Sequence, residues 1–134
     1  MHKFSEHSLA RLATCHPDLQ RLAIEVIKEV DCTVVCGHRC EADQRHDYET
    51  GASKKDWPDS KHNSMPSMAI DLAPYIQGHG IPWSDHMAFV AFAATVLRVA
   101  KRIGVAIRWG GDWNGNGDRK DQTFHDLPHF ELKG

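Results

Sequence analysis

The sequence lacks a long hydrophobic run. Its longest apolar stretch, Met87–Leu97, is interrupted by Thr95 and falls short of the roughly 20 residues that a membrane-spanning helix needs. The N-terminal segment MHKFSEHSLARLATCH has no continuous apolar core of signal-peptide length. We therefore expect a chain that is made in the cytoplasm and has no stable membrane insertion. If its target lies beyond the membrane, another component has to release it.

An excess of either charge is also missing. The 134 residues include 16 lysines and arginines and 18 aspartates and glutamates, which gives a net charge of −2. Without a basic stripe, no nucleic-acid partner is expected, and this argues against a metal-dependent nuclease using His62 and Asn63. No repeat, low-complexity segment or linker divides the chain. We therefore expect a single domain over residues 1–134, present as a monomer.

Cysteines are few, at positions 15, 32, 36 and 40. A cytosolic chain keeps its thiols reduced, so no disulfide framework is expected. The spacing Cys32-x-x-x-Cys36-x-x-x-Cys40 does not match well the paired cysteines of structural zinc sites. We expect buried or incidental thiols.

Hydrophobic spacing, caps and glycines predict the secondary structure. In chain order we expect a short helix capped near Ser5 or Ser8, a helix from Pro17, a strand over Cys32–Cys36, a helix over Glu41–Thr50, a strand over Met68–Ala73, a long helix from a Ser84 cap to Ile103, and strands over Val105–Trp109 and His129–Leu132. The long helix is apolar nearly all round, which predicts a central buried element. This order predicts a small α+β domain whose central antiparallel sheet packs against helices.

The segment FHDLPHFEL, residues 124–132, places two histidines at the spacing of the zinc-binding helix pattern His-Glu-x-x-His. However, Pro128 precedes the second histidine, His129, and a proline inside a helix costs ~3 kcal/mol. It also favours extended geometry at Leu127. A metal site here would therefore lie on an extended segment.

Three polar residues near predicted strands are candidate metal ligands: His62 in SKHN, Asp71 in MAIDLA and His129 in LPHFEL. A carboxylate inside a buried strand costs several kcal/mol unless it is paired or bound to a metal. Two imidazoles and one carboxylate are a suitable zinc set with a fourth position open for water. The alternative is that Asp71 accepts a hydrogen bond from a histidine or arginine and no metal is present.

The motifs SKH, AIDLAPY and D-x-x-H together resemble those of the M15-type zinc peptidoglycan peptidases. That family includes D-Ala-D-Ala dipeptidases and carboxypeptidases, and the L-alanyl-D-glutamate endopeptidases that phages use as endolysins. The resemblance implies a hedgehog/DD-peptidase-like fold with His62, Asp71 and His129 as zinc ligands. It also implies that Asp126 is the general base, and that Arg39, in Gly37-His38-Arg39, stabilises the oxyanion.

The spacer between His62 and Asp71 is longer than in the family's commonest S-x-H-x-x-G-x-A-x-D form, and an insertion around Met65-Pro66 would explain this. An aspartate base favours the endolysin branch. The resemblance thus implies cleavage of the L-alanyl-D-glutamate bond in the peptide stem of bacterial peptidoglycan, during host lysis by a bacteriophage. The alternatives are a D-Ala-D-Ala carboxypeptidase or dipeptidase, and a non-catalytic zinc-stabilised binding module.

A second candidate site is the loop DWNGNGD, which fits the opening D-x-N-x-N-G of a calcium loop. Its oxygen ligands would be Asp112, Asn114, Asn116 and Asp118. The twelfth position is Thr123 instead of the usual bidentate glutamate, so a turn without calcium is the alternative.

Two further residues are expected to contact the substrate. They are Ser60, from the S-x-H motif, and Trp109, at the start of the same loop. For Trp109, a position in the core or at the rim of the site is the alternative.

Overall fold

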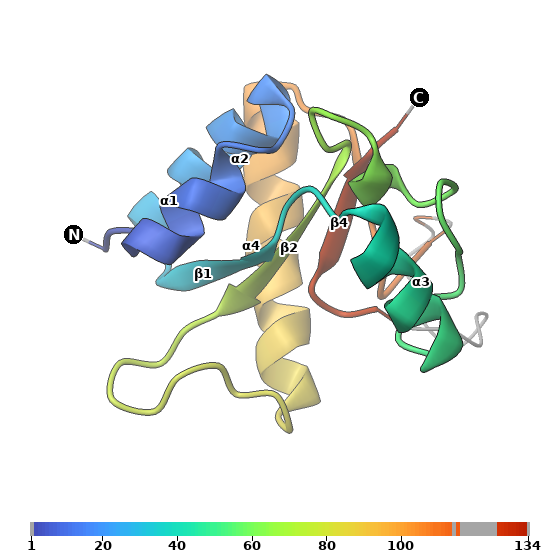
Figure 1. Ribbon diagram of the computed structural model, residues 1–134. Coiled ribbons are helices and arrows are strands. Elements are labelled where there is room, and N and C mark those ends of the chain that lie inside the picture. The colour runs from blue at the N-terminus through green and yellow to red at the C-terminus, as the bar shows by residue number, and fades with distance from the viewer. Residues whose placement is uncertain (1, 114, 116–125, 134) are drawn as a thin grey trace.

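A computed structural model describes residues 2–113, 115 and 126–133 of the chain. Its elements are shown in Figure 1, and their order is α1 (Glu6–Leu12), α2 (Pro17–Glu29), β1 (Cys32–Cys36), α3 (Glu41–Glu49), the short 3-10 helix η1 (Lys61–Asn63), β2 (Ala69–Pro74), α4 (His86–Ile103), β3 (Ile107–Trp109) and β4 (His129–Leu132).

The four strands form one antiparallel sheet in the order β1-β2-β4-β3. β4 therefore lies between β2 and β3, although it follows both of them in the chain. Figure 1 shows α4 running behind β2, with α1 and α2 on one side of the molecule and α3 on the other. The prediction of an α+β domain with a central antiparallel sheet packed against helices is confirmed.

Three helix ends follow the capping residues and the proline that the sequence indicated. The Ser5 side chain accepts a hydrogen bond from the Ser8 amide at 3.1 Å and so caps α1. Pro17 occupies the first position of α2, where its missing N–H costs nothing. Gly104 ends α4 in the left-handed conformation, with φ of 78°.

Two expectations for α4 are wrong. Its N-cap is Asp85 rather than Ser84, and the Asp85 carboxylate accepts a hydrogen bond from the Ala88 amide at 3.2 Å. Nor is the helix buried all round, because Ala91 and Ala94 lie on an exposed side, where a methyl group leaves little apolar surface in water. Among the described residues, no helix is long and apolar enough to cross a membrane.

The sheet has one apolar face and one polar face. Side chains alternate along a strand, so Leu72 of β2 and Phe130 of β4 point to the same side, into the core. There Phe92 of α4 meets Phe130 edge to face, with ring centroids 6.4 Å apart. The intervening residues Asp71 and His129 point to the opposite side. The fold thus places its polar strand residues away from the helical core.

Candidate metal centre

Three side chains with metal-binding groups meet on the polar face of the sheet. Asp71 of β2 lies directly opposite His129 of β4 in the antiparallel register. His62 comes from η1, which a reciprocal capping box between Ser60 and Asn63 holds in place. His62, Asp71 and His129 are only 1%, 8% and 6% exposed. The structure therefore brings together the three residues that were predicted as metal ligands.

The facing atoms of these residues form a small triangle. His62 Nε2 lies 3.1 Å from Asp71 Oδ1 and 3.2 Å from His129 Nδ1, and 3.3 Å separate His129 Nδ1 from Asp71 Oδ1. Zinc binds nitrogen and oxygen at about 2.0–2.2 Å in a tetrahedron, whose edges then measure roughly 3.3–3.6 Å. The triangle is therefore close in size to one face of a tetrahedral metal site.

In each histidine, the ring nitrogen that points away from the triangle, here called the outer nitrogen, lies near a hydrogen-bond acceptor. His62 Nδ1 lies 2.7 Å from the Gly37 carbonyl oxygen, and His129 Nε2 lies 2.8 Å from Glu131 Oε1. A carbonyl and a carboxylate can only accept, so the outer nitrogens carry the hydrogens. The inner nitrogens then direct lone pairs at each other and at the Asp71 carboxylate. Electron pairs that converge in a buried space require a cation, so this group could hold a metal ion.

Without a metal, protons have to supply the positive charge. Burial opposes the charge on Asp71, but the charge of His62 and hydrogen bonds from His129 and His62 hold the pKa of Asp71 below its usual range. Burial likewise opposes the charged imidazoles, but Asp71 outweighs it and raises the pKa of both His62 and His129. Metal binding therefore has to displace protons, which weakens it at low pH.

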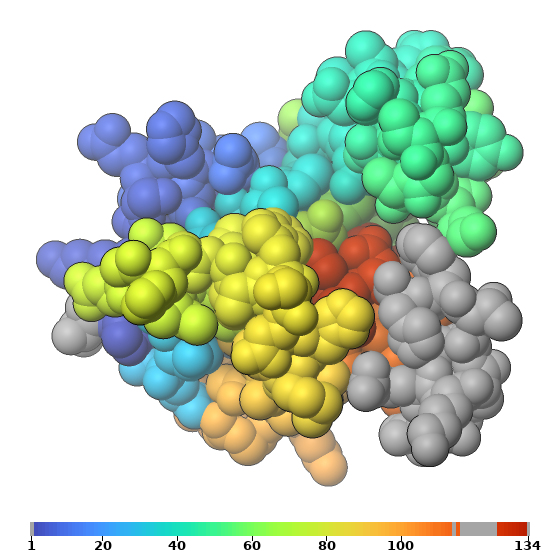
Figure 2. Space-filling model, turned by 90° about the horizontal axis from the view of Figure 1, so that it is seen from below, coloured from blue at the N-terminus to red at the C-terminus, as the bar shows by residue number. Residues whose placement is uncertain are grey.

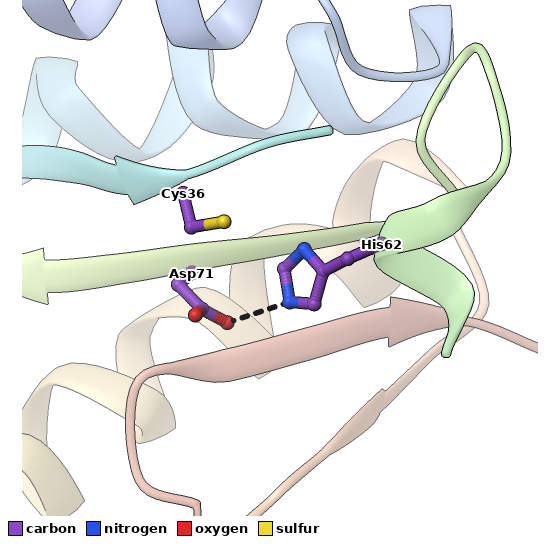
Figure 3. A group of neighbouring side chains, drawn as sticks. All are labelled: Cys36, His62 and Asp71. Atoms are coloured by element: carbon purple, nitrogen blue, oxygen red, sulfur yellow. Dashed lines mark hydrogen bonds and ion pairs between the residues drawn. The ribbon is translucent and has the colours of Figure 1, made fainter. Parts of the chain in front are cut away.

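A thiol also lies beside this centre. A β-bulge between Val34 and Cys36 places Cys36 opposite Asp71 in the register. Figure 3 shows Cys36 and Asp71 on neighbouring strands with His62 reaching toward them, and one ligand atom from each lies within 4.8 Å of the others. Cys36 is thus an alternative third ligand. The contacts of His129 at 3.2 and 3.3 Å favour the histidine.

Asp126 lies in the turn that leads into β4. Its Oδ2 is 3.9 Å from His129 Nδ1, and its carbonyl oxygen accepts a hydrogen bond from the His129 amide at 3.1 Å. Burial, followed by the negative charge of Asp71, raises the pKa of Asp126 to about 6. Pro128 belongs to the same turn, so the prediction that PHFEL is not helical is confirmed.

A buried network fixes Arg39 at the edge of the centre. Arg39 Nη1 donates to Gln44 Oε1 at 2.9 Å, while Nε lies 3.2 Å from Asp47 Oδ2 and Nη2 lies 3.7 Å from Asp71 Oδ2. Gln44 is fully buried and also accepts a hydrogen bond from Asn63 Nδ2 at 3.1 Å. Since each guanidinium nitrogen has a partner, Arg39 is oriented beside Asp71.

A pocket of about 400 Å³ opens onto these groups. Its walls include His62, His129, Asp126, Arg39 and Ser60. In Figure 2 the red atoms of the β4 segment lie in a hollow beside the green atoms of the α3 segment. The volume is in the range of small-ligand sites, and the two predicted catalytic residues and Ser60 share the pocket with two predicted ligands.

Trp109, which was expected to contact substrate, lies in the core cluster instead. Its Nε1 donates to the Leu127 carbonyl oxygen at 2.8 Å. Alternation along β3 explains this, because Trp109 faces the core while its neighbour Arg108 faces the pocket. Trp113 lines the pocket, with its ring centroid 5.4 Å from that of His129.

The predicted calcium loop falls mostly outside the described residues, which exclude Asn114, Asn116 and Asp118. Asp112 is described; it is half-buried, and its amide donates to the Trp109 carbonyl oxygen at 3.1 Å. The calcium site therefore stays a prediction.

Comparison with known proteins gives the family. The profile of the family described as phage L-alanyl-D-glutamate peptidase matches residues 1–133. The chain belongs to this family. It is 38% identical over 136 residues to the L-alanyl-D-glutamate peptidase of Escherichia phage T5, with 97% of each chain covered. The crystal structure of the Serratia marcescens L-Ala D-Glu endopeptidase ChiX matches with a TM-score of 0.76 and 27% identity, covering 99% of this chain and 90% of that chain.

Membership of the phage L-alanyl-D-glutamate peptidase family confirms the resemblance drawn from SKH, AIDLAPY and D-x-x-H. Three contributors to the centre were missed: Glu131, Gln44 and Cys36. For Glu131 a signal existed, because in a strand it lies on the same face as His129. Gln44 stands in a uniformly polar helix and had no signal in the sequence. Cys36 was considered only as part of a cysteine-only zinc site, because its position opposite Asp71 depends on the bulge.

Proposed function

We propose that this chain is a zinc-dependent peptidoglycan hydrolase. It cleaves the L-alanyl-D-glutamate bond of the peptide stem and acts as a phage endolysin in host cell lysis. The observation that carries the proposal is the convergence of His62 Nε2, Asp71 Oδ1 and His129 Nδ1 within 3.1–3.3 Å of one another, beside a pocket that His62 and His129 line. The choice of the L-alanyl-D-glutamate bond rests on the names of the two relatives, which are both peptidases of that bond.

The donor set supports zinc. Two imidazole nitrogens and one carboxylate oxygen are the ligands that catalytic zinc takes in proteins, with the fourth position open. His62, Asp71 and His129 would hold the ion. When bound, zinc supplies a Lewis acid that polarises a carbonyl and lowers the pKa of water to about 7.

We assign proton transfer to Asp126. Its carboxylate lies on the pocket wall near His129, where burial and the charge of Asp71 raise its pKa to about 6. A carboxyl group with a pKa near the working pH can accept a proton from the attacking water and pass it to the leaving amine. A bound cation would lower this pKa and favour the basic form.

We assign stabilisation of the developing oxyanion to Arg39. The residue is 14% exposed in its side chain and lines the same pocket. Its hydrogen bonds to Gln44 and its ion pair with Asp47 hold the guanidinium before substrate arrives. A donor that is already oriented loses little free energy in reorganisation when the carbonyl oxygen becomes charged.

The test is mass spectrometry of purified Gram-negative peptidoglycan after incubation with the protein. Parallel samples contain a chelator, chelator with zinc restored, and the Asp126→Asn variant. Asp43→Asn, an exposed aspartate on α3, is the matched control. We expect a new free amine on D-glutamate that is lost with chelator, restored by zinc, nearly absent for Asp126→Asn and unchanged for Asp43→Asn.

The other outcomes lead to the alternatives. Released D-alanine would assign the chain to the carboxypeptidases or dipeptidases. If zinc binds but no bond is cut in any sample, the chain is a zinc-stabilised binding module, and the roles of Asp126 and Arg39 are refuted.

A further inference from the structure

The polar face of the sheet carries one more charged group beside the centre. Arg108 of β3 lies directly opposite Glu131 of β4 in the register. Opposite residues point to the same face, so Arg108 shares the face of Asp71 and His129 and lines the same pocket. Two residues along a strand span about 7 Å, and neighbouring strands lie about 4.8 Å apart, so the Arg108 backbone is roughly 8 Å from that of His129.

Glu131, the acid opposite Arg108 in the register, is bound to other partners. Glu131 Oε1 is bound to His129 Nε2 at 2.8 Å, and Glu131 Oε2 lies 3.4 Å from Lys61 Nζ. Lys61 also donates to the Leu132 carbonyl oxygen. Both carboxylate oxygens of Glu131 are therefore occupied.

Arg108 differs in this respect from the other arginine of the pocket. Arg39 is bound to Gln44, Asp47 and Asp71. Among the described residues, the exposed Arg108 side chain has no hydrogen-bond or ion-pair partner. A guanidinium with all its donors available in a pocket is suited to a planar, two-oxygen anion, which it can bind through two parallel hydrogen bonds.

The proposed substrate has such an anion next to its scissile bond. Glutamate has two carboxyl groups, and a peptide chain that continues beyond it uses only one of them. The other stays free. If it is the α-carboxylate, three bonds separate its carbon from the scissile carbonyl carbon, a distance of about 3 to 3.7 Å. A cation near the metal centre could therefore bind this carboxylate while the alanyl carbonyl lies at the metal.

We propose that Arg108 forms a subsite for the free carboxylate of the D-glutamyl residue and so selects the acidic stem over its amidated form. This rests on the proposed function. Charge and shape together give the selectivity, because a primary amide of the same size has no charge and offers only one acceptor oxygen. Arg108 acts as a substrate-binding residue and takes no part in holding the metal.

The test compares two synthetic peptides. Both are N-acetylated L-alanyl-D-glutamyl peptides extended through one carboxyl group; the other carboxyl is free in the first and a primary amide in the second. With zinc-loaded wild type, we expect kcat/KM to be about 10- to 100-fold higher for the acid, the range that a charge-assisted hydrogen bond gives. In Arg108→Gln the acid should lose that advantage, so that the two peptides are cleaved at similar rates, with the loss mainly in KM.

Two further variants separate this subsite from general electrostatics. Arg108→Lys keeps the positive charge but loses the planar pair of hydrogen-bond donors, so it should retain part of the preference for the acid peptide. Lys55→Gln removes one exposed charge from the same pocket and should leave the acid-to-amide ratio as in the wild type. Zinc content and melting temperature should match the wild type in all three variants.

The outcomes distinguish the two proposals. If the wild type cleaves both peptides equally well, or if Arg108→Gln keeps the full preference for the acid, the subsite is refuted while the proposed function stands. The same holds if Lys55→Gln abolishes the preference. If the wild type cleaves neither peptide, the proposed function fails and the subsite fails with it.

Discussion

The contact between Glu131 and His129 makes a quantitative prediction about metal affinity. Glu131 Oε1 accepts the His129 Nε2 hydrogen at 2.8 Å in a buried setting, and this bond fixes which histidine nitrogen faces the centre. A hydrogen bond to a charged group contributes about 1.5–3 kcal/mol, roughly twice a neutral one. Glu131→Gln keeps an acceptor oxygen but loses the charge, so about half of that free energy should be lost.

That loss corresponds to zinc binding weaker by about three- to tenfold, since each 1.4 kcal/mol is a factor of ten. Glu131→Ala removes the acceptor and leaves the His129 ring free to turn. We therefore expect the zinc affinity to fall by up to about 100-fold, the upper end for residues that hydrogen-bond to a metal ligand. The assay is a competition titration against a chromophoric zinc chelator at neutral pH. Glu25→Gln, which breaks an exposed ion pair with Lys28 on α2, is the matched control.

The result that would refute this reasoning is specific. If Glu131→Gln and Glu131→Ala both bind zinc as tightly as the wild type, His129 is not held by Glu131 in the metal-bound state. If Glu25→Gln weakens binding as much as they do, the effect is one of net charge rather than of the hydrogen bond.

Three other predictions follow from the same centre. Asp126→Asn should lower kcat by about 10²–10⁴-fold with unchanged zinc content, measured by stem-peptide turnover and metal analysis. Gln44→Leu leaves donors of Arg39 and Asn63 without their acceptor and should cost about 1–3 kcal/mol in urea unfolding of the metal-free protein. Burial opposes the charge on Glu131, but its bond to His129 and nearby positive charges lower its pKa from 4.5 to about 2. Its stabilising contribution is therefore complete above its unfolded pKa and lost as pH falls toward 2, and Glu131→Gln should flatten that part of the acid-unfolding curve.

Two of the three predicted metal ligands could be singled out because their local sequence is unusual, and the family resemblance added His62. Asp71 is a carboxylate within an apolar strand, and His129 follows a proline that excludes the helical alternative. Both signals are readable from the immediate neighbours in the chain. Strand β4 was predicted with the bounds that the structure shows, because its alternation is bounded by the Pro128 turn.

The remaining parts of the centre depend on which segments meet in space. The sequence around Gln44 is polar and does not distinguish it from the other residues of α3. Only the packing of α3 against the segments around it buries Gln44, where its side chain accepts a hydrogen bond from Arg39. Trp109 was expected at the pocket because it adjoins the loop, but one position along β3 decides which face a side chain takes. The choice between Ser84 and Asp85 as a cap was equally beyond the sequence, since both residue types are good caps.

The central place of β4 has a consequence for the timing of folding. This strand pairs with β2, which lies far back in the chain, so its contacts are non-local, and non-local strand pairing is intrinsically slow. It also carries His129, so the sheet and the proposed metal centre both depend on this strand. A chain interrupted between β3 and β4 would lack both an interior strand of the sheet and His129, the predicted ligand. The peptidase would therefore have no partly active fragments, and hydrolytic capacity would appear only when synthesis has passed the last strand.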